Sequence, residues 1–263
     1  MAPWIERLAR AGFVAKALLY MTVGVMAAMA GLGLGGKAAT DQHGAMLSLL
    51  HKPLGRGLLA AIAIGLTGYA VWRIIEAFAD PEGHGRSAKG LAHRVRSFIT
   101  GGIHLGLALS AAKLALYQHD DHNSSREAQE WTARALSKPG GKLIVGLAAA
   151  AFVGYGLYQL FKAIKSKLNK RLALESLGHT TRKIVVGVSR FGIAARGIVF
   201  GMIGVMLARA AYDGNAKEAG GVSKSMRELF GFGTQPFVAI AVGLMAYGVY
   251  QLINARYRRI RVD

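Results

Sequence analysis

Long stretches without a charged side chain are the feature of this sequence that most limits its possible folds. They lie at 17–36, 57–72, 97–112, 143–161 and 229–255, with a shorter one at 197–208. A helix of roughly 20 apolar residues crosses about 30 Å of hydrocarbon, and a flanking Lys or Arg can snorkel where the run is shorter. We therefore predict an all-α integral membrane protein with six transmembrane helices, at 12–33, 56–78, 97–117, 141–163, 191–211 and 235–255.

The second, fourth and sixth predicted helices carry a repeated sequence. It reads GYAVWRI from Gly68, GYGLYQL from Gly154 and AYGVYQL from Ala246. Three sets of positions correspond: Tyr69, Tyr155 and Tyr247; Trp72, Tyr158 and Tyr250; and Arg73, Gln159 and Gln251. A repeat of this spacing indicates that one structural unit recurs along the chain.

The first and fifth predicted helices repeat in the same way, with Lys16 opposite Arg196. We predict three tandem units within one membrane domain, at 1–89, 90–176 and 177–263. Each unit is a helix, an external loop and a second helix, so all three enter the membrane in the same orientation. An axis along the membrane normal can relate such parallel repeats, which predicts a pseudo-threefold arrangement. Short helical patterns occur in the external loops, at 44–51, 126–137 and 223–230.

Basic residues lie mainly on one side of the predicted membrane. The termini and the loops at 74–97 and 162–196 carry most of the 33 Lys and Arg residues, whereas the loops inside the units hold more of the 14 acidic residues. The positive-inside bias therefore places both termini in the cytoplasm. The chain has a net charge of +19, and the basic residues on this side attract anionic headgroups. We expect membrane lipids, rather than nucleic acid, as the partners of this charge.

Three motifs together resemble a known family. They are the R-x-G-(F/I)-x-A-(K/R) helix start, the D-x-x-G-A-x-L-x-x-L-x-x-P-x-G-R connection at 41–56, and G-Y-x-x-W-R at 68–73. They are similar to the bacterial membrane family catalogued as domain of unknown function 1206, and the resemblance covers essentially the whole chain. It implies six helices in three pairs and a place in the bacterial inner membrane. It implies no established chemistry.

The repeated sequence has two interpretations. Tyr155, Tyr158 and Gln159 share nearly one helix face, because they are spaced i, i+3 and i+4. We expect the outer aromatic residue to lie in an interfacial belt, and the small residue before each Tyr to let a neighbouring helix approach. The alternative is a ring of the three Tyr residues around the repeat axis, together with Arg73, Gln159 and Gln251.

Other ionisable residues are weaker candidates for a site. Lys16, His104 and Arg196 fall within predicted spans, where an ionisable residue is a functional candidate by default. Snorkelling explains the two cations, and we expect a neutral His104 that is hydrogen-bonded to a neighbouring helix. His119 and His122 offer ligands that suit a transition metal, but a solvated loop also explains them. We therefore predict no metal site.

Sequence motifs of enzymes are absent. The chain has no Cys, which excludes thiol catalysis and thiolate ligands. It also has no G-x-x-x-x-G-K-(S/T) phosphate loop and no H-E-x-x-H metal motif. No acidic residue lies in the middle of a span, which disfavours a proton-coupled pump. We expect neither an enzymatic activity nor a cofactor.

Three classes of function remain. We favour a non-catalytic scaffold or accessory component of the membrane, with protein partners or further copies of the chain. The alternative is a channel or transporter for a small solute, with its pathway along the repeat axis. An enzyme that acts on lipid or quinone is the third class. The enclosed surface discriminates the first two, because a packed apolar axis favours a scaffold and a cavity lined by Tyr, Gln and Arg favours transport.

The charge distribution makes a topology prediction. Reporter proteins fused at Asp263 or within 84–93 should be active only if the reporter works in the cytoplasm, because the positive-inside bias retains these segments there. A fusion within 126–137 serves as the control and should give the opposite result. A periplasmic signal at Asp263 would overturn the orientation.

Overall fold

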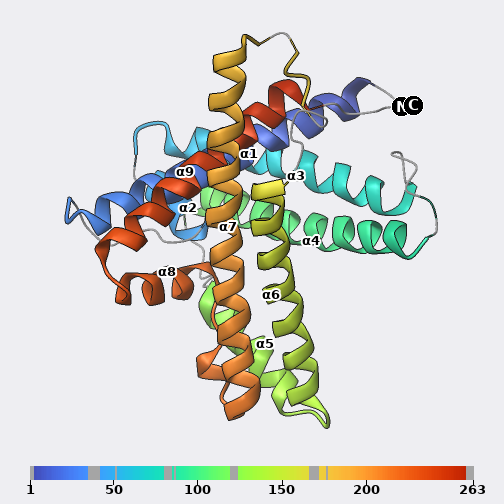
Figure 1. Ribbon diagram of the computed structural model, residues 1–263, viewed down its shortest axis with the longest axis vertical. Helices are drawn as coiled ribbons and strands as arrows, with labels where there is room; N and C mark the ends of the chain where they lie inside the picture. The colour runs from blue at the N-terminus through green and yellow to red at the C-terminus, as the bar shows by residue number, and fades with distance from the viewer. Residues whose placement is uncertain are drawn as a thin grey trace.

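The computed structural model describes residues 3–34, 42–50, 52–79, 85, 87–118, 124–165, 172–175 and 177–258. Six long helices dominate this part of the chain (Figure 1). They are α1 (Pro3–Gly31), α3 (Gly55–Ala79), α4 (Ala88–Tyr117), α6 (Gly141–Lys165), α7 (His179–Asp213) and α9 (Thr234–Tyr257). Each contains a segment long and apolar enough to span a membrane. The all-helical class and the six predicted spans are confirmed, and they indicate a multi-pass membrane protein.

The fifth span differs from its prediction at one end. Helix α7 begins at His179, although the sequence suggested a start near 191. The charged residues before the apolar run do not stop the helix, because helix ends depend on caps and breaking residues rather than on hydropathy. Gly178 precedes the helix at its N-cap position, and Gly214 ends it in a left-handed conformation with φ of 67°.

Short helices occupy the connections inside the three units. They are α2 (Gln42–Leu50), α5 (Ser124–Leu136) and α8 (Val222–Gly231), preceded in the third unit by the 3-10 helix η2 (Ala216–Glu218). Met46 of α2 and Met226 of α8 are fully buried among the long helices. These loops therefore contribute to the apolar core instead of lying wholly on its surface.

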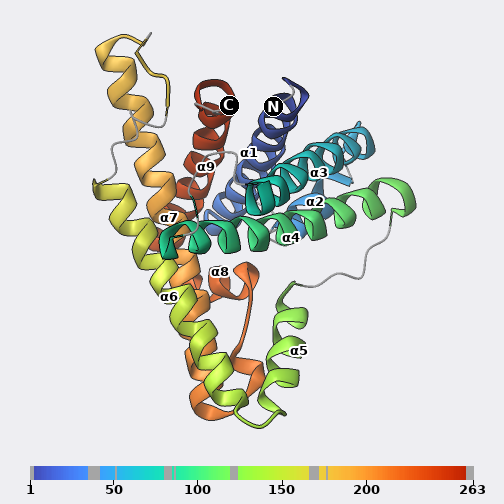
Figure 2. The same cartoon turned by 90° about the vertical axis from the view of Figure 1, so that its right-hand side faces the viewer.

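The long helices pack most closely in three pairs, α3 with α4, α6 with α7, and α1 with α9. Each pair joins the second helix of one unit to the first helix of another. The three pairs cross near the centre of the molecule and run in different directions (Figures 1 and 2). The start of α1 lies beside the end of α9, where Arg10 Nη1 donates a hydrogen bond of 3.1 Å to the carbonyl oxygen of Arg256.

Glycine allows these pairs to approach closely. A Cβ atom at Gly156 of α6 would lie 2.8 Å from the carbonyl oxygen of Gly197 in α7. A Cβ atom at Gly248 of α9 would lie 2.9 Å from the carbonyl oxygen of Ala17 in α1. Helices in lipid associate through such small-residue contacts. Both glycines follow a repeated Tyr, whereas the predicted small residue before it, Gly154, faces open space.

Packing inside the units depends on one position in each first helix. Gly12 of α1 lies against Tyr69 of α3, and Gly192 of α7 lies against Tyr247 of α9, with no room for a Cβ atom in either case. In the middle unit Arg96 of α4 faces Tyr155 of α6, and its guanidinium carbon is 5.9 Å from the ring centre.

The long side chain at Arg96 prevents the close approach that the two glycines permit. Among the described residues, α4 and α6 share few contacts, although they belong to one unit, whereas α1 packs on α3 and α7 packs on α9. The three units are therefore unequal in packing. The pseudo-threefold axis stays a prediction.

Substitution at Gly192 tests this packing. We expect Gly192→Ala to lower the melting temperature of the purified protein in detergent, because overpacking at the Tyr247 backbone costs about 1–3 kcal/mol. Gly187→Ala is the matched control in the same helix, since a Cβ atom there meets nothing within 4 Å. Circular dichroism during heating measures both variants. Equal melting temperatures would contradict the close contact.

Candidate functional site

A cavity of about 70 Å³ lies where the three helix pairs meet. It exceeds the roughly 10–15 Å³ that one water molecule requires, so it can hold several waters or a small ion. All six long helices contribute to its wall. We call it the basic chamber, and its lining residues are Phe13, Lys16, Tyr69, Arg73, Arg96, Thr100, Tyr155, Gln159, Lys162, Ile193, Arg196, Tyr247, Tyr250, Gln251, Asn254 and Arg258.

Positive charge dominates the lining of the basic chamber. Six of its side chains are cationic, namely Lys16, Arg73, Arg96, Lys162, Arg196 and Arg258. No Asp or Glu is among the lining residues. The other polar groups are hydroxyls and amides, which are neutral hydrogen-bonding partners. The arrangement therefore favours an anion over a cation.

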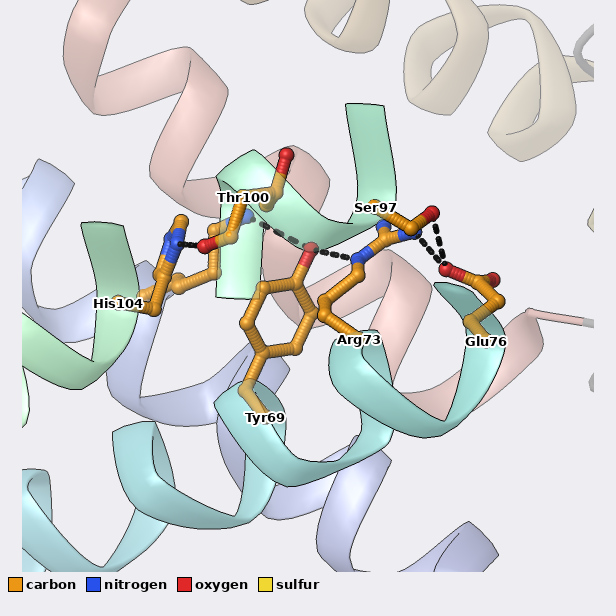
Figure 3. A network of polar contacts seen from close by, with 7 residues as sticks. Tyr69, Arg73, Glu76, Ser97, Thr100 and His104 are labelled. Atoms are coloured by element: carbon orange, nitrogen blue, oxygen red, sulfur yellow. Dashed lines mark hydrogen bonds and ion pairs between the residues drawn. The ribbon is translucent and has the colours of Figure 1, made fainter. Parts of the chain in front are cut away.

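One polar network connects α1 with α3. Lys16 is only 5% exposed, and its Nζ donates a hydrogen bond of 3.2 Å to the hydroxyl oxygen of Tyr69. Arg73 Nε donates a second bond of 2.9 Å to the same oxygen, as Figure 3 shows. Lys16 Nζ also lies 4.3 Å from the centre of the Tyr69 ring, within the range of a cation–π interaction. Tyr69 therefore holds two cations near the basic chamber.

A carboxylate lies on the other side of Arg73 (Figure 3). Glu76, one turn further along α3, forms an ion pair with Arg73 Nη1. Ser97 of α4 donates a hydrogen bond of 2.9 Å to the same carboxylate oxygen. Glu76 is buried but does not line the basic chamber. Its negative charge offsets the charge of Arg73 on the side away from the chamber, so the chamber lining remains basic.

A second polar network surrounds Arg196 of α7. Its Nε donates to the hydroxyl of Tyr20 at 3.2 Å, and its Nη1 donates to the hydroxyl of Tyr155 at 3.1 Å. Its guanidinium carbon is 5.0 Å from the ring centre of Tyr247. The sequence predicts that Lys16 and Arg196 snorkel toward the membrane surface. Both instead point inward and contact tyrosines.

The repeated tyrosines all reach the basic chamber. Tyr69, Tyr155 and Tyr247 line it, together with the residues four positions later, Arg73, Gln159 and Gln251. The outer aromatic residues differ among the units, since Trp72 and Tyr250 are buried and Tyr158 is 43% exposed. Of the three outer aromatic residues, only Tyr158 has the exposure expected in an interfacial belt. The other two contribute to the interior.

His104 serves a local structural contact. It is buried, and its Nδ1 is 2.7 Å from the carbonyl oxygen of Thr100 in the same helix, rather than bonded to a neighbouring helix as predicted. Its ring meets Tyr69 edge-on, with centroids 4.8 Å apart. His119 and His122 lie outside the described residues. Within the described ranges, no group of three or more His, Asp or Glu side chains could hold a metal ion.

Lys162, Asn254 and Arg96 were not predicted from the sequence, whereas Glu76 was expected as an i, i+3 partner of Arg73. Glu76, Lys162 and Asn254 each lie seven positions after a repeated Tyr. Positions i, i+4 and i+7 share one helix face, so a polar residue recurring at i+7 was a usable signal. Arg96 lies where the first helices of the other two units have glycine. This correspondence becomes apparent only in the structure, where Arg96, Gly12 and Gly192 each lie against a repeated Tyr.

Comparison with known proteins places the chain in a family. The family model described as Domain of Unknown Function (DUF1206) matches residues 11–80, 95–166 and 191–258. The chain belongs to this family. Each matched region falls inside one predicted unit and contains both of its long apolar spans. The family model therefore recognises the same threefold repetition.

A bacterial relative shares nearly the full length. The uncharacterised protein YxxB of Bacillus subtilis (strain 168) is 31% identical over 263 residues, which covers 98% of this chain and 93% of the relative. No solved structure matches the chain. The expected family is thus confirmed, and it assigns no activity.

The Tyr69 hydroxyl provides a test of the polar network. We expect Tyr69→Phe to lower stability by about 1–3 kcal/mol, because Lys16 and Arg73 lose a shared buried acceptor. Tyr158→Phe is the matched control, since this tyrosine occupies the repeated sequence but is 43% exposed. Thermal unfolding in detergent measures both. A stable Tyr69→Phe protein would remove the hydroxyl from this role.

Proposed function

We propose that this protein is a non-enzymatic membrane protein that binds a small anion in the basic chamber and transports it. The observation that carries the proposal is the chamber lining, with six cationic side chains and no carboxylate. A cavity lined by Tyr, Gln and Arg is the feature that the sequence analysis associated with solute transport. The family is consistent with a polytopic membrane protein but names no solute.

Electrostatics favours an anion at this position. Cations buried in a membrane protein are costly unless they are paired or hydrogen-bonded. Lys16 and Arg196 have tyrosine hydroxyls as partners, and neither forms a salt bridge with a described residue. Arg73 has a buried carboxylate at its side, in Glu76. A bound anion would offset the repulsion among the cations and accept hydrogen bonds from them.

The lining residues come from the helix halves that the charge distribution assigns to the cytoplasm of a bacterial cell. Lys and Arg residues in the adjoining loops would concentrate anions near the basic chamber. On the other side of the basic chamber, two apolar clusters that include Met46 and Met226 pack α1 against α3 and α4 and against α7 and α9. This packing would act as the closed external gate of a carrier. Transport requires that it open.

A scaffold is the second candidate, because close glycine contacts support a rigid assembly. Gly156 and Gly248 bring neighbouring backbones together, as they would in a purely structural component. The two candidates make different demands on the basic chamber. A scaffold needs no anion there, whereas a carrier needs both binding and passage.

Anion binding can be measured with the purified chain. We expect inorganic phosphate or sulfate to raise its melting temperature, and Lys16→Gln or Arg196→Gln to weaken the apparent affinity at least about tenfold through lost charge-assisted bonds. Arg190→Gln is the matched control, because Arg190 is an exposed arginine of α7 that does not line the basic chamber. Stabilisation that survives both chamber substitutions would refute the site.

Flux separates the two candidates. Vesicles that contain the protein should take up the anion that stabilises it, and Gln159→Leu should reduce uptake because Gln159 is a buried chamber residue. Binding without uptake, by protein that remains folded, would reject the carrier. It would leave an anion-regulated scaffold.

A further inference from the structure

The basic chamber is open on one side. Among its polar lining residues Lys16, Gln159 and Gln251 are buried, whereas Arg96 is exposed. Arg96 belongs to α4, and the chamber residues opposite it, Tyr155 and Lys162, belong to α6. Because these two helices share few contacts, the chamber reaches the surface between them. We call this opening the α4–α6 mouth.

In the described part of the chain, helix packing covers two other sides of the basic chamber. The pairs α1 with α3 and α7 with α9 pack together within their units, so no equivalent mouth forms there. Near the end of α9, the backbone N–H of Ala173 donates a 2.8 Å hydrogen bond to the carbonyl oxygen of Tyr257. This bond holds Leu172 and Leu174 in a buried cluster with the chamber residues Ile193 and Tyr247. Leu172 and Leu174 therefore pack against the chamber wall beside α7 and α9.

The mouth has an amphipathic border. Ile103 of α4 is 57% exposed, and Tyr158 of α6, three residues after the chamber residue Tyr155, is 43% exposed. In a membrane-spanning helix such side chains contact acyl chains. A rise of about 1.5 Å per residue places Arg96 about 12 Å from the start of α4, within reach of the headgroup region. Cations and hydrocarbon-facing side chains therefore meet at one opening.

We propose that the anion bound by the basic chamber is the phosphate of an anionic membrane lipid, which enters sideways through the α4–α6 mouth. This proposal rests on the anion site described above. The phosphate would meet Arg96 and Lys162 at the mouth, with Lys16 and Arg196 deeper inside. The acyl chains would remain outside, against the exposed apolar side chains of α4 and α6. The small chamber volume suits a phosphate group whose lipid tail stays in the bilayer.

Charge favours a lipid over a second copy of the chain at this mouth. A twofold dimer through the mouth would bring each Arg96 and Lys162 toward the same residues of the partner, and like charges across an interface are unfavourable. An anionic lipid supplies the opposite charge together with matching hydrocarbon. Charge complementarity and apolar contact therefore act in the same direction.

Spin-labelled lipids test the proposal in reconstituted membranes. Electron paramagnetic resonance measures how strongly labelled phosphatidylglycerol associates with the full chain, relative to labelled phosphatidylcholine. We expect a preference for phosphatidylglycerol that falls about fivefold in Arg96→Gln, the factor expected for one cation near an anionic headgroup. Arg190→Gln removes an equally exposed arginine from α7, away from the mouth, and should keep the preference. Melting temperatures monitor folding of both variants.

Soluble glycerol phosphate separates a lipid from a free anion. It should compete with labelled phosphatidylglycerol in the wild-type protein, because both place a phosphate in the basic chamber. An unchanged lipid preference in Arg96→Gln, or a stable dimer that covers the mouth, would overturn the lipid proposal. If phosphate still stabilised the wild-type protein but not Arg196→Gln, the anion site itself would stand. If phosphate failed to stabilise the wild-type protein, the proposed function itself would be refuted.

Discussion

Burial of cations between apolar helices is the constraint on which the centre of this structure depends. Lys16, Arg73 and Arg196 lie where hydration is limited, and each would be costly without partners. Tyrosines supply most of these partners, because one side chain offers an apolar body, a ring face for cation–π contact and a hydroxyl acceptor. Tyr69 illustrates the solution by accepting from Lys16 and Arg73 together.

The position of the only carboxylate in this network explains why the basic chamber stays positive. Glu76 pairs with Arg73 and accepts from Ser97, away from the chamber lining. It stabilises the guanidinium without occupying the space where an anion would bind. A carboxylate inside the chamber would compete with any external anion. An anion site is therefore physically reasonable, because the carboxylate that stabilises Arg73 lies apart from the surface where an anion would bind.

Inequality among the repeats gives the chamber its opening. Two units have glycine where the first helix meets the repeated Tyr, and their two helices pack together. The middle unit has Arg96 at this contact, and its two helices remain apart. Arg96 in place of glycine thus has two effects, since its long side chain keeps α4 apart from α6 and adds a cation at the resulting gap. A strictly symmetric protein would have neither.

The sequence by itself determined the helical class, the six spans, the three units and the family. These properties follow from apolar run length and from recurrence along the chain, which are local quantities. It also identified Tyr69, Arg73 and Gln159, but it could not decide whether they faced lipid or one another. Only the tertiary structure decided that, because a helix face acquires its environment from neighbours distant in sequence, such as Lys16 beside Tyr69. The open side at Arg96 was decided in the same way, by which helices pack and which do not.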